Sequence, residues 1–219
     1  TKVLTHKIAY LVKEKGIRPH RILAITFTKK AANEMVERIM KMLSIKPMWI
    51  STFHSFCVKV LREDVHMLER SFDRKFVIYD TADSLKVLKN ILKRFSRETK
   101  EADDARDVIS KAKQEYRSSI FDYIAALPYP ASTYAEVAEE YQKDLERSNA
   151  MDYDDLIYFA VRILSAYPKT RTKWQERFDY LLIDEFQDTN DIQFSLIKLL
   201  AGRSKNLFAV GDFFQCIYT

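Results

Sequence analysis

The sequence predicts an α/β protein that is built on a parallel sheet and carries an inserted, mainly helical segment. Three observations support this prediction. Four short apolar runs are continuous rather than alternating, which is typical of strands buried on both faces of a parallel sheet. Each run changes directly to polar residues at its C-terminal end. Helical periodicity follows most of the runs, and alternating strands and helices indicate βαβ units with right-handed crossovers.

The first segment is predicted to be a helix. Gly16 follows it at the position of a C-terminal cap. The helix has no start signal of its own, because Thr1 is the first residue and there is no initiator Met. We therefore expect the chain to be cut from a larger protein. The apolar residues of the segment share one helical face: Leu4, Ile8, Leu11 and Val12.

Four strands are predicted where the apolar runs lie. In open α/β sheets, ligands bind at the carboxyl ends of the strands, so we expect a functional site at that edge. The polar residues that follow the runs are the first candidates for it. The predicted strands are Ile22–Ile25, Trp49–Ile50, Tyr180–Ile183 and Leu207–Val210.

Helices are predicted after three of these strands, because apolar residues recur there with a period of about 3.6. The stripe after the third strand is followed by Gly202, which is predicted to end the helix. The three stripes are Ala32, Met35, Val36, Ile39, Met40 and Leu43; then Phe53, Phe56, Cys57, Val60 and Leu61; then Ile192, Leu196, Ile197, Leu199 and Leu200.

The middle of the chain is predicted to be a helical subdomain inserted between strands of the sheet. A short apolar run at residues 76–79 interrupts it, and Asp80 or Thr81 is a candidate cap for the helix that follows. Residues 93–113 are charge-dense and mixed in sign, which favours a solvated helical face. The predicted division is a discontinuous core at residues 1–62 and 151–219, with the insertion at 63–150.

The amino-acid composition excludes some classes of protein. The chain has 219 residues, of which 47% are apolar and 31% charged, so a disordered chain is excluded. No apolar run approaches the length of a membrane span, and the start lacks a signal-peptide pattern.

The net charge of +5 permits a polyanionic partner without requiring one. Cys57 and Cys216 are far apart in the sequence, which favours a reducing compartment over a disulfide framework or zinc site.

Glycine is scarce, with only three in the chain. A phosphate-binding loop needs several glycines close together, so the sequence holds no complete P-loop or dinucleotide fingerprint. Any nucleotide chemistry must use the other half of such a site.

Asp184 and Glu185 are the candidates for this other half of a nucleotide site, which binds Mg²⁺ and activates water. They directly follow the predicted strand at residues 180–183, as in a Walker B arrangement. Mg²⁺ keeps most of its waters and takes only one or two carboxylates, so Asp184 is sufficient, and Glu185 can orient or deprotonate an attacking water. The alternative is a polar turn that caps the next helix. That alternative explains the cap residues at 188–190 but not an acidic pair placed after four apolar positions.

The stretch from Asp184 to Asn190 resembles motif II of the superfamily 1 helicases of the UvrD/Rep/PcrA type. Three other stretches match motifs of this family in the family's order, and a further one resembles the acidic–aromatic segment that precedes motif II. These stretches are Ile25–Met35 (motif Ia), Ile50–Phe56 (motif Ib), Ala209–Tyr218 (motif III) and Met151–Leu156 (the acidic–aromatic segment).

The resemblance implies a RecA-like P-loop NTPase fold and the N-terminal motor domain, 1A plus 1B, of an ATP-dependent DNA helicase or translocase acting in repair, replication or recombination. ATP and Mg²⁺ are the implied cofactors. Asp184 would bind Mg²⁺, Glu185 would be the catalytic base and Gln215 would sense the γ-phosphate. Thr1 would be the last residue of Walker A, with its hydroxyl on Mg²⁺. The loop lysine would lie upstream and a second motor domain downstream, so we expect negligible ATP turnover from this chain alone.

The resemblance also implies a track for single-stranded DNA. Phe27 would stack on a base, with Thr26, Thr28 and Lys29 beside it. In the family an Asn usually stands at the position of Lys29, so that contact would become electrostatic. Thr52 and His54 would donate to backbone phosphates, and Tyr218 would be a second stacking group. From the residues alone, the favoured interpretation of Phe27 is a core side chain, and that of His54 is a locally hydrogen-bonded residue at the start of a helix.

Two other functions stay open from the sequence. One is a RecB- or AddA-like helicase–nuclease subunit, and the other is a non-catalytic single-strand-binding module. The intact Asp184, Glu185 and Gln215 argue against the second. The expected partners are single-stranded DNA, single-strand/duplex junctions and a second motor domain of the same parent chain, with no membrane. The expected location is cytoplasmic and nucleoid-associated.

Overall fold

The computed structural model describes residues 2–45, 49–115, 119–202 and 206–212. The chain divides into two compact units, which are described separately here. The sheet unit consists of residues 1–59, 164–189 and 193–219, and the helical unit of residues 60–163 and 190–192. The domain division made from the sequence, with boundaries after residues 62 and 150, stays a prediction.

Helices dominate both units in number, and the strands are short. In chain order the helices are α1 (Lys2–Lys13), α2 (Lys29–Leu43), α3 (Phe53–Asp64), α4 (Thr81–Arg94), α5 (Ala102–Gln114), α6 (Ile120–Ala125), α7 (Ala135–Arg147), α8 (Tyr153–Ala166), α9 (Pro168–Gln175) and α10 (Asp191–Ala201). The strands are β1 (Ile22–Thr26), β2 (Ile50–Thr52), β3 (Val77–Ile78), β4 (Ala150–Met151), β5 (Tyr180–Ile183) and β6 (Leu207–Ala209).

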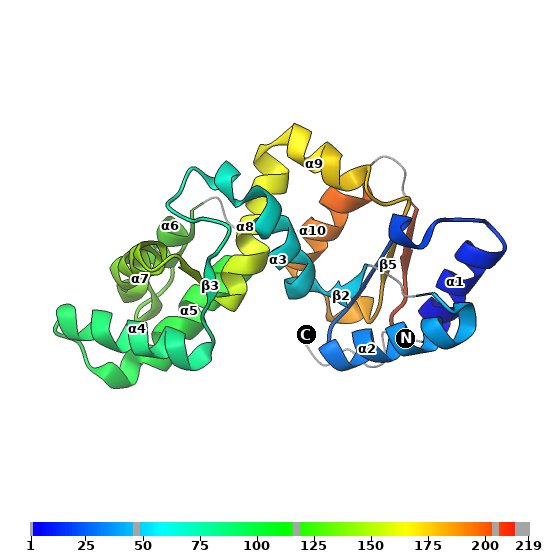
Figure 1. Ribbon diagram of the computed structural model, residues 1–219. Helices are drawn as coiled ribbons and strands as arrows, with labels where there is room; N and C mark the ends of the chain where they lie inside the picture. Colours follow the sequence, from blue (N-terminus) through cyan, green and yellow to red (C-terminus); the bar gives the residue numbers. More distant parts are fainter. Residues whose placement is uncertain (1, 46–48, 116–118, 203–205, 213–219) are drawn as a thin grey trace. The chain divides into compact units, whose positions relative to one another are not determined.

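The sheet unit contains a four-stranded, fully parallel sheet with strand order β2-β1-β5-β6 (Figure 1). All four strands predicted from the apolar runs are present, and β5 has the predicted bounds. In β1 every residue is buried, as expected for a central strand covered on both faces. The mixed α/β class with a parallel sheet is therefore confirmed.

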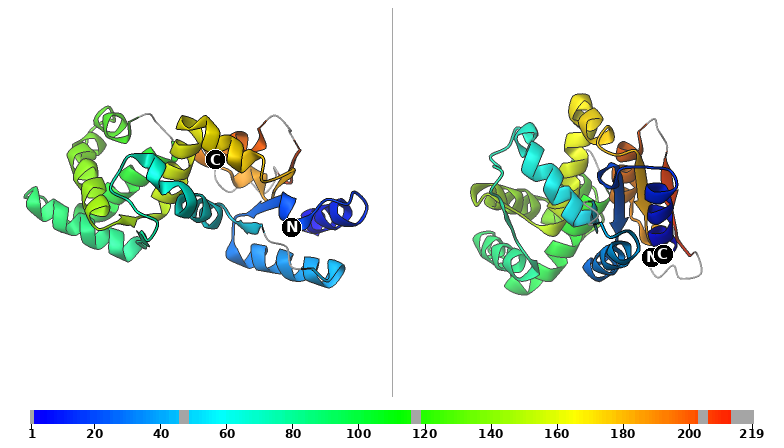
Figure 2. Two further views of the ribbon diagram at one scale, coloured as in Figure 1. Left: turned by 45° about the horizontal axis from the view of Figure 1, so that its top comes forward. Right: turned by 45° about the vertical axis from the view of Figure 1, so that its right-hand side comes forward.

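Helices cover both faces of this sheet. On one face, α1 and α2 pack on β1 and β5, and Figure 1 shows α10 on the other side of the strands from α1. The left view of Figure 2 shows α1 and α2 together on one side of the strands. The core of this face consists of Leu4, Ile8, Leu11, Ile22, Ala24, Met35, Ile39 and Leu182.

The opposite face carries an aromatic cluster made of Trp49, Phe56, Trp174 and Phe178. The rings of Phe56 and Trp174 lie 5.5 Å apart, and those of Trp49 and Phe178 lie 5.2 Å apart, both edge to face. Such pairs are favourable beyond the apolar area that they bury. Cations cover the outside of the cluster, with the Lys59 ammonium 4.3 Å from the Trp49 ring centroid.

Two apolar positions of the predicted core are exposed instead. The sequence pattern predicts Met40 on the buried stripe of its helix, but Met40 is 45% exposed. The sheet covers only a narrower face of α2, which holds Met35 and Ile39. Leu207 in β6 is 39% exposed. In the part of the chain that the structure describes, β6 is an edge strand, so the expectation of burial on both faces was wrong for it.

The helical unit contains α4 to α7 and a small parallel sheet in which β3 pairs with β4. The sequence pointed to β3 but not to β4. Of the two predicted cap candidates, Asp80 caps α4 and Thr81 is the first residue of the helix. The Asp80 carboxylate accepts from the backbone N–H of Asp83 at 2.9 Å, and the Asp83 carboxylate accepts from the backbone N–H of Asp80 at 3.3 Å. This reciprocal capping box fixes the start of the helix.

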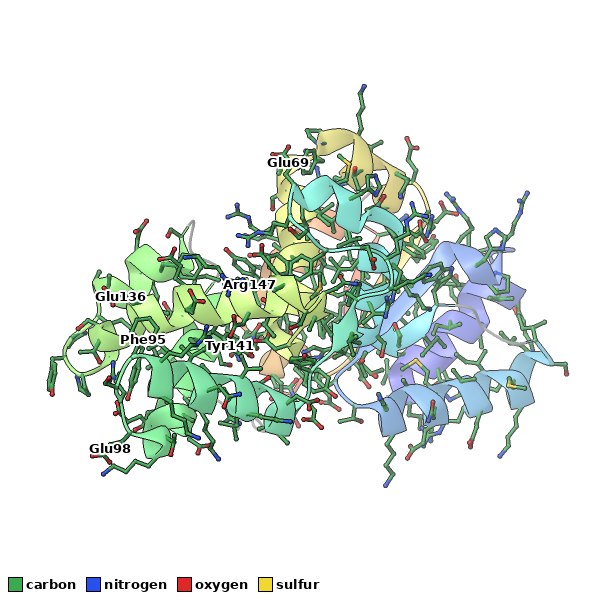
Figure 3. All side chains as sticks on the ribbon, turned by 60° about the vertical axis from the view of Figure 1, so that its left-hand side comes forward. Glu69, Phe95, Glu98, Glu136, Tyr141 and Arg147 are labelled. Carbon is green, nitrogen blue, oxygen red and sulfur yellow. The ribbon has the colours of Figure 1, made fainter. Side chains whose placement is uncertain are left out.

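Lys113 corrects the prediction that residues 93–113 form a solvated face. Its side chain is 1% exposed, and Nζ lies 2.7 Å from Asp152 Oδ2 and 2.8 Å from Asp155 Oδ1. Tyr141, labelled in Figure 3, donates its hydroxyl to the same oxygen of Asp152 at 3.1 Å. Burial would lower the pKa of Lys113, but the two carboxylates raise it above its usual range.

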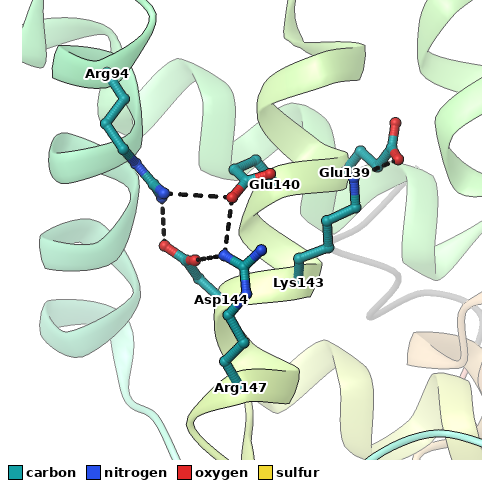
Figure 4. A network of polar contacts seen from close by, with 6 residues as sticks. All are labelled: Arg94, Glu139, Glu140, Lys143, Asp144 and Arg147. Atoms are coloured by element: carbon teal, nitrogen blue, oxygen red, sulfur yellow. Dashed lines mark hydrogen bonds and ion pairs between the residues drawn. The ribbon is translucent and has the colours of Figure 1, made fainter.

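A second polar network joins α4 to α7 at the surface (Figure 4). Arg94 and Arg147 both pair with Glu140 and Asp144. The hydrogen bond from Arg147 lowers the pKa of Glu140. Exposed pairs of this kind contribute little individually, so the network orients the two helices more than it stabilises them.

No helix among the described residues combines the length and apolar character that crossing a membrane would require.

Candidate functional site

The carboxyl ends of the strands meet at one edge of the sheet, as expected. Thr26 at the end of β1 pairs in register with Thr52 at the end of β2. On the other side of β1, the backbone N–H of Asp184 donates to the carbonyl of Ile25 at 2.9 Å. The edge therefore brings together three segments that are distant in sequence, and the polar residues predicted from each segment lie along it.

The end of β1 holds the predicted residues Thr26 to Lys29. Thr26 is buried, and its hydroxyl donates to the carbonyl of Thr28 at 3.1 Å. Thr28 caps α2, since its Oγ1 accepts from the backbone N–H of Ala31 at 3.1 Å. Lys29 is exposed. Phe27 is half-buried, and its ring lies edge to face on Phe53 with centroids 5.5 Å apart. Phe53 packs against one side of the Phe27 ring, and because Phe27 is only half-buried, another part of the ring is exposed to solvent.

The end of β2 leads into α3. Thr52 is buried, and its hydroxyl donates to Ser55 Oγ at 3.0 Å while accepting from the Ser55 backbone N–H at 3.3 Å. The hydroxyl thus satisfies one of the first N–H groups of the helix. His54 is half-buried in the first turn of α3. An anion placed here would also meet the favourable end of the helix dipole.

The end of β5 holds the acidic pair. Asp184 is 1% exposed. Glu185 adopts the left-handed backbone conformation, with φ 49° and ψ 48°. This conformation is costly for a residue with a side chain and persists only where the surroundings impose it. The surroundings do so here, because the backbone N–H of Phe186 donates to the carbonyl of Val210 at 2.9 Å and that of Asp188 to the carbonyl of Glu185 at 3.0 Å.

Gln187 also belongs to this site, although no role was predicted for it from the sequence. Its Nε2 donates to Glu185 Oε2 at 2.9 Å, and its Oε1 accepts from the backbone N–H of Asp212 at 3.0 Å. The only signal in the sequence was its place two residues after Glu185, which says nothing about a contact with residue 212. Thr1, Gln215 and Tyr218, which were predicted as site residues, lie outside the described residues.

The donor set at this edge suits a hard cation. Asp184 offers carboxylate oxygens at the strand end, and Mg²⁺ uses only one or two carboxylates together with waters and phosphate oxygens. Within the described residues, no group of three or more His, Cys, Asp or Glu side chains could hold a metal ion. Asp188 Oδ1 and Thr189 Oγ1 are buried and have no hydrogen-bond partner in the described part of the chain. Such oxygens are satisfied by water or a bound group when one is present.

Comparison with known proteins gives a match over the whole chain. Residues 1–219 match the family described as the UvrD/REP helicase N-terminal domain. The chain is 43% identical to a protein named ATP-dependent DNA helicase PcrA from Bacillus subtilis (strain 168) over 222 aligned residues. It is 40% identical over the same length to proteins of that name from Staphylococcus aureus (strain Mu50) and Staphylococcus epidermidis. In each case all of this chain is aligned, and it spans 30% of the relative's length.

Proposed function

The chain belongs to the UvrD/REP helicase N-terminal domain family, and from this premise we propose that it is the N-terminal motor domain of an ATP-dependent DNA helicase. The observation that carries the proposal is the acidic pair: a buried Asp184 and a conformationally constrained Glu185 at the carboxyl edge of a parallel sheet. In this proposal residues 1–62 and 151–219 form the motor core 1A and residues 63–150 form the insertion 1B. The proposed site of action is nucleoid DNA.

The proposed reaction is hydrolysis of ATP by in-line attack of water. The water oxygen bonds to the γ-phosphorus, the bond to the β,γ-bridging oxygen breaks, and ADP leaves with that electron pair. Glu185 accepts the proton that the water loses. Asp184 and the Thr1 hydroxyl would hold Mg²⁺, which supplies charge stabilisation for the phosphates when bound. Gln215 would contact the γ-phosphate.

The carboxyl ends of two other strands, β1 and β2, supply the proposed DNA track. Phe27 supported by Phe53 suits base stacking, because one side of the ring is fixed by the protein. Thr26, Thr28 and Lys29 lie beside it, and Thr52 and His54 follow on the neighbouring strand end. Tyr218 would be a further stacking residue. Single-stranded DNA, its junctions with duplex and a second motor domain of the parent chain are the proposed partners.

The alternatives draw less support. The relatives are named as ATP-dependent DNA helicases, which does not favour a nuclease subunit. A binding module without turnover has no need of a strained acidic turn, which costs about 1–3 kcal/mol of folding free energy.

The test of this function is ATP hydrolysis by the full-length protein that carries this chain, with and without single-stranded DNA, together with strand separation of a tailed duplex. We expect hydrolysis that rises on addition of the single strand, and strand separation that requires ATP. Tight single-strand binding without any ATP turnover would contradict the motor and favour the binding module.

Phe27→Ala tests the stacking contact. Because stacking contributes about 1–3 kcal/mol per base, we expect single-strand affinity to fall by about 5- to 150-fold. The measurement is fluorescence anisotropy of a labelled oligonucleotide at several salt concentrations. The salt slope should stay the same, because no phosphate contact is removed.

Phe95→Ala is the matched control. Phe95 is also a partly exposed phenylalanine, at 39%, but it lies at the end of α4 in the helical unit. Single-strand affinity should be unchanged in this variant. Equal affinities of the Phe27→Ala and wild-type proteins would remove Phe27 from the DNA track.

A further inference from the structure

We propose that Gln187 is a positioning residue for ATP hydrolysis, which holds the Glu185 carboxylate toward the attacking water and links it to the loop after β6. The inference rests on the proposed function, since it assigns a partner to the proposed catalytic base. It concerns a residue that is not expected to touch either ATP or DNA.

The contacts of Gln187 fix both ends of its amide. A carboxylate can only accept and a backbone N–H can only donate, so Nε2 must face Glu185 Oε2, at 2.9 Å, and Oε1 must face Asp212 N, at 3.0 Å. Nε2 also lies 3.5 Å from Asp188 Oδ2. Rotating the amide by 180° would lose both of the short bonds, so the orientation of Gln187 is determined by its neighbours.

The hydrogen bond from Gln187 restricts the conformation of the Glu185 side chain. Its backbone is held in the left-handed region by the turn, but its side chain still has rotatable bonds that a solvent-facing carboxylate would sample. A hydrogen bond to one carboxylate oxygen restricts that sampling and leaves the other oxygen available to accept a proton. General-base catalysis depends on this geometry, because the base must lie within hydrogen-bond reach of the water.

The backbone of Gly211 packs closely against Gln187. A Cβ added at Gly211 would lie 2.6 Å from Gln187 Oε1 and 3.2 Å from the Gln187 backbone nitrogen. Both distances are shorter than ordinary van der Waals contact, so the loop after β6 packs directly on the amide. In the sequence, Gln215, the proposed γ-phosphate sensor, follows Asp212 by three residues. A change in this loop therefore has a direct route, through Asp212 and Gln187, to the position of Glu185.

Two substitutions separate the two ends of the amide. Gln187→Glu keeps an acceptor for Asp212 N but replaces the donor to Glu185 with a second carboxylate. Gln187→Met removes both hydrogen bonds with little change in volume. In the full-length protein we expect kcat for ATP hydrolysis to fall by about 10- to 100-fold in both variants, with KM for ATP changed less than threefold.

The pH–rate profile distinguishes positioning from a loss of structure. In Gln187→Glu two carboxylates face each other and share a proton, so the acidic limb of the profile should move to higher pH. In Gln187→Met the limb should stay nearer that of the wild type while the plateau falls. Unfolding of Gln187→Glu that merely reduced its active fraction would lower the plateau without moving the limb, so it is this variant that separates the two explanations.

Two further variants protect the test from a folding failure. Gly211→Ala leaves Gln187 in the sequence but displaces its amide, and it should lower kcat in the same way. Gln175→Met is the matched control, because Gln175 Nε2 also makes a short hydrogen bond, to the Leu199 carbonyl at 2.6 Å, at the opposite end of the sheet unit. It should leave kcat within twofold of the wild type.

A double-mutant cycle with Glu185→Gln decides the inference. If Gln187 acts through Glu185, adding Gln187→Met to Glu185→Gln lowers turnover little further. A full additional loss in the double variant, or wild-type kcat in both Gln187 variants, would overturn the inference while leaving the function intact. Wild-type turnover in Glu185→Gln alone would instead overturn the proposed base, and with it the premise.

Discussion

The Glu185→Gln variant of the full-length protein is expected to hydrolyse ATP about 10²- to 10⁴-fold more slowly than the wild type, the range that general-base catalysis supplies. Glutamine keeps the size of the side chain and can still contact Gln187, but it cannot accept a proton from water. The measurement is steady-state ATP turnover at saturating single-stranded DNA. Binding of ATP should persist, because Glu185 is not assigned to the nucleotide.

Glu37→Gln provides the matched control. Glu37 is an exposed residue of α2 in the same unit, so the same loss of charge there should leave turnover unchanged. A fall of less than threefold in Glu185→Gln would contradict the assignment of Glu185 as base. Asp184, the other member of the acidic pair, would then be the next candidate for the base.

Lys113→Met is the substitution with the largest expected effect on stability. Removing one partner of a buried ion pair leaves the remaining charges uncompensated and typically costs about 3–5 kcal/mol. Here the uncompensated groups would be Asp155, which is fully buried, and Asp152. We expect α5 and the start of α8 to lose protection first, as followed by hydrogen–deuterium exchange of peptides from the helical unit.

The effect should depend on pH. Burial, reinforced by the neighbouring Asp152, raises the pKa of Asp155 to about 7 even though Lys113 opposes the shift. The folded protein thus holds a proton that the unfolded chain releases from about pH 4 upward, so this group's contribution to the free energy of unfolding falls as pH rises to about 7. Without Lys113 the window extends to higher pH. The destabilisation of the variant relative to wild type should therefore be larger at pH 8 than at pH 5.

Two variants check the cause. Lys111→Met removes an exposed cation from the same helix and should change stability by less than about 0.5 kcal/mol. Adding Asp155→Asn to Lys113→Met removes the buried charge and should recover part of the loss at pH 8. A destabilisation by Lys113→Met that is the same at both pH values would show that packing, and not charge, accounts for it.

The main sheet was predictable because its strands are continuous apolar runs, and β5 follows directly from Tyr180–Ile183. The two-residue strand β4 was not predictable, since Ala150 and Met151 carry no periodic pattern and pair only because β3 lies beside them. Lys113 was misplaced for a similar reason. A lysine in a charge-dense stretch looks solvated, and only the positions of Asp152 and Asp155 show that it is enclosed.

The candidate site shows the same limit. Residues at the strand ends could be predicted, because the edge of a parallel sheet follows from topology. The contact between Gln187 and Asp212 could not, because it depends on how the loop after β6 returns to the turn after β5. The left-handed conformation of Glu185 was equally hidden, since glutamate has no preference for it.

The neighbouring strands β1 and β5 set the order in which the molecule can assemble. Arg21 and Asp179, which pair beside these strands, are 158 positions apart, so β1 and β5 cannot pair until the long stretch between them has been synthesised. The stretch between them contains nearly all of the helical unit, in which successive helices contact each other from α4 to α7. Local contacts form faster than distant ones, since less chain entropy is lost on loop closure. On the ribosome the helices would consequently form while β1 has β2 on one edge but not yet β5 on the other, which leaves an apolar strand edge open to chaperones or to aggregation.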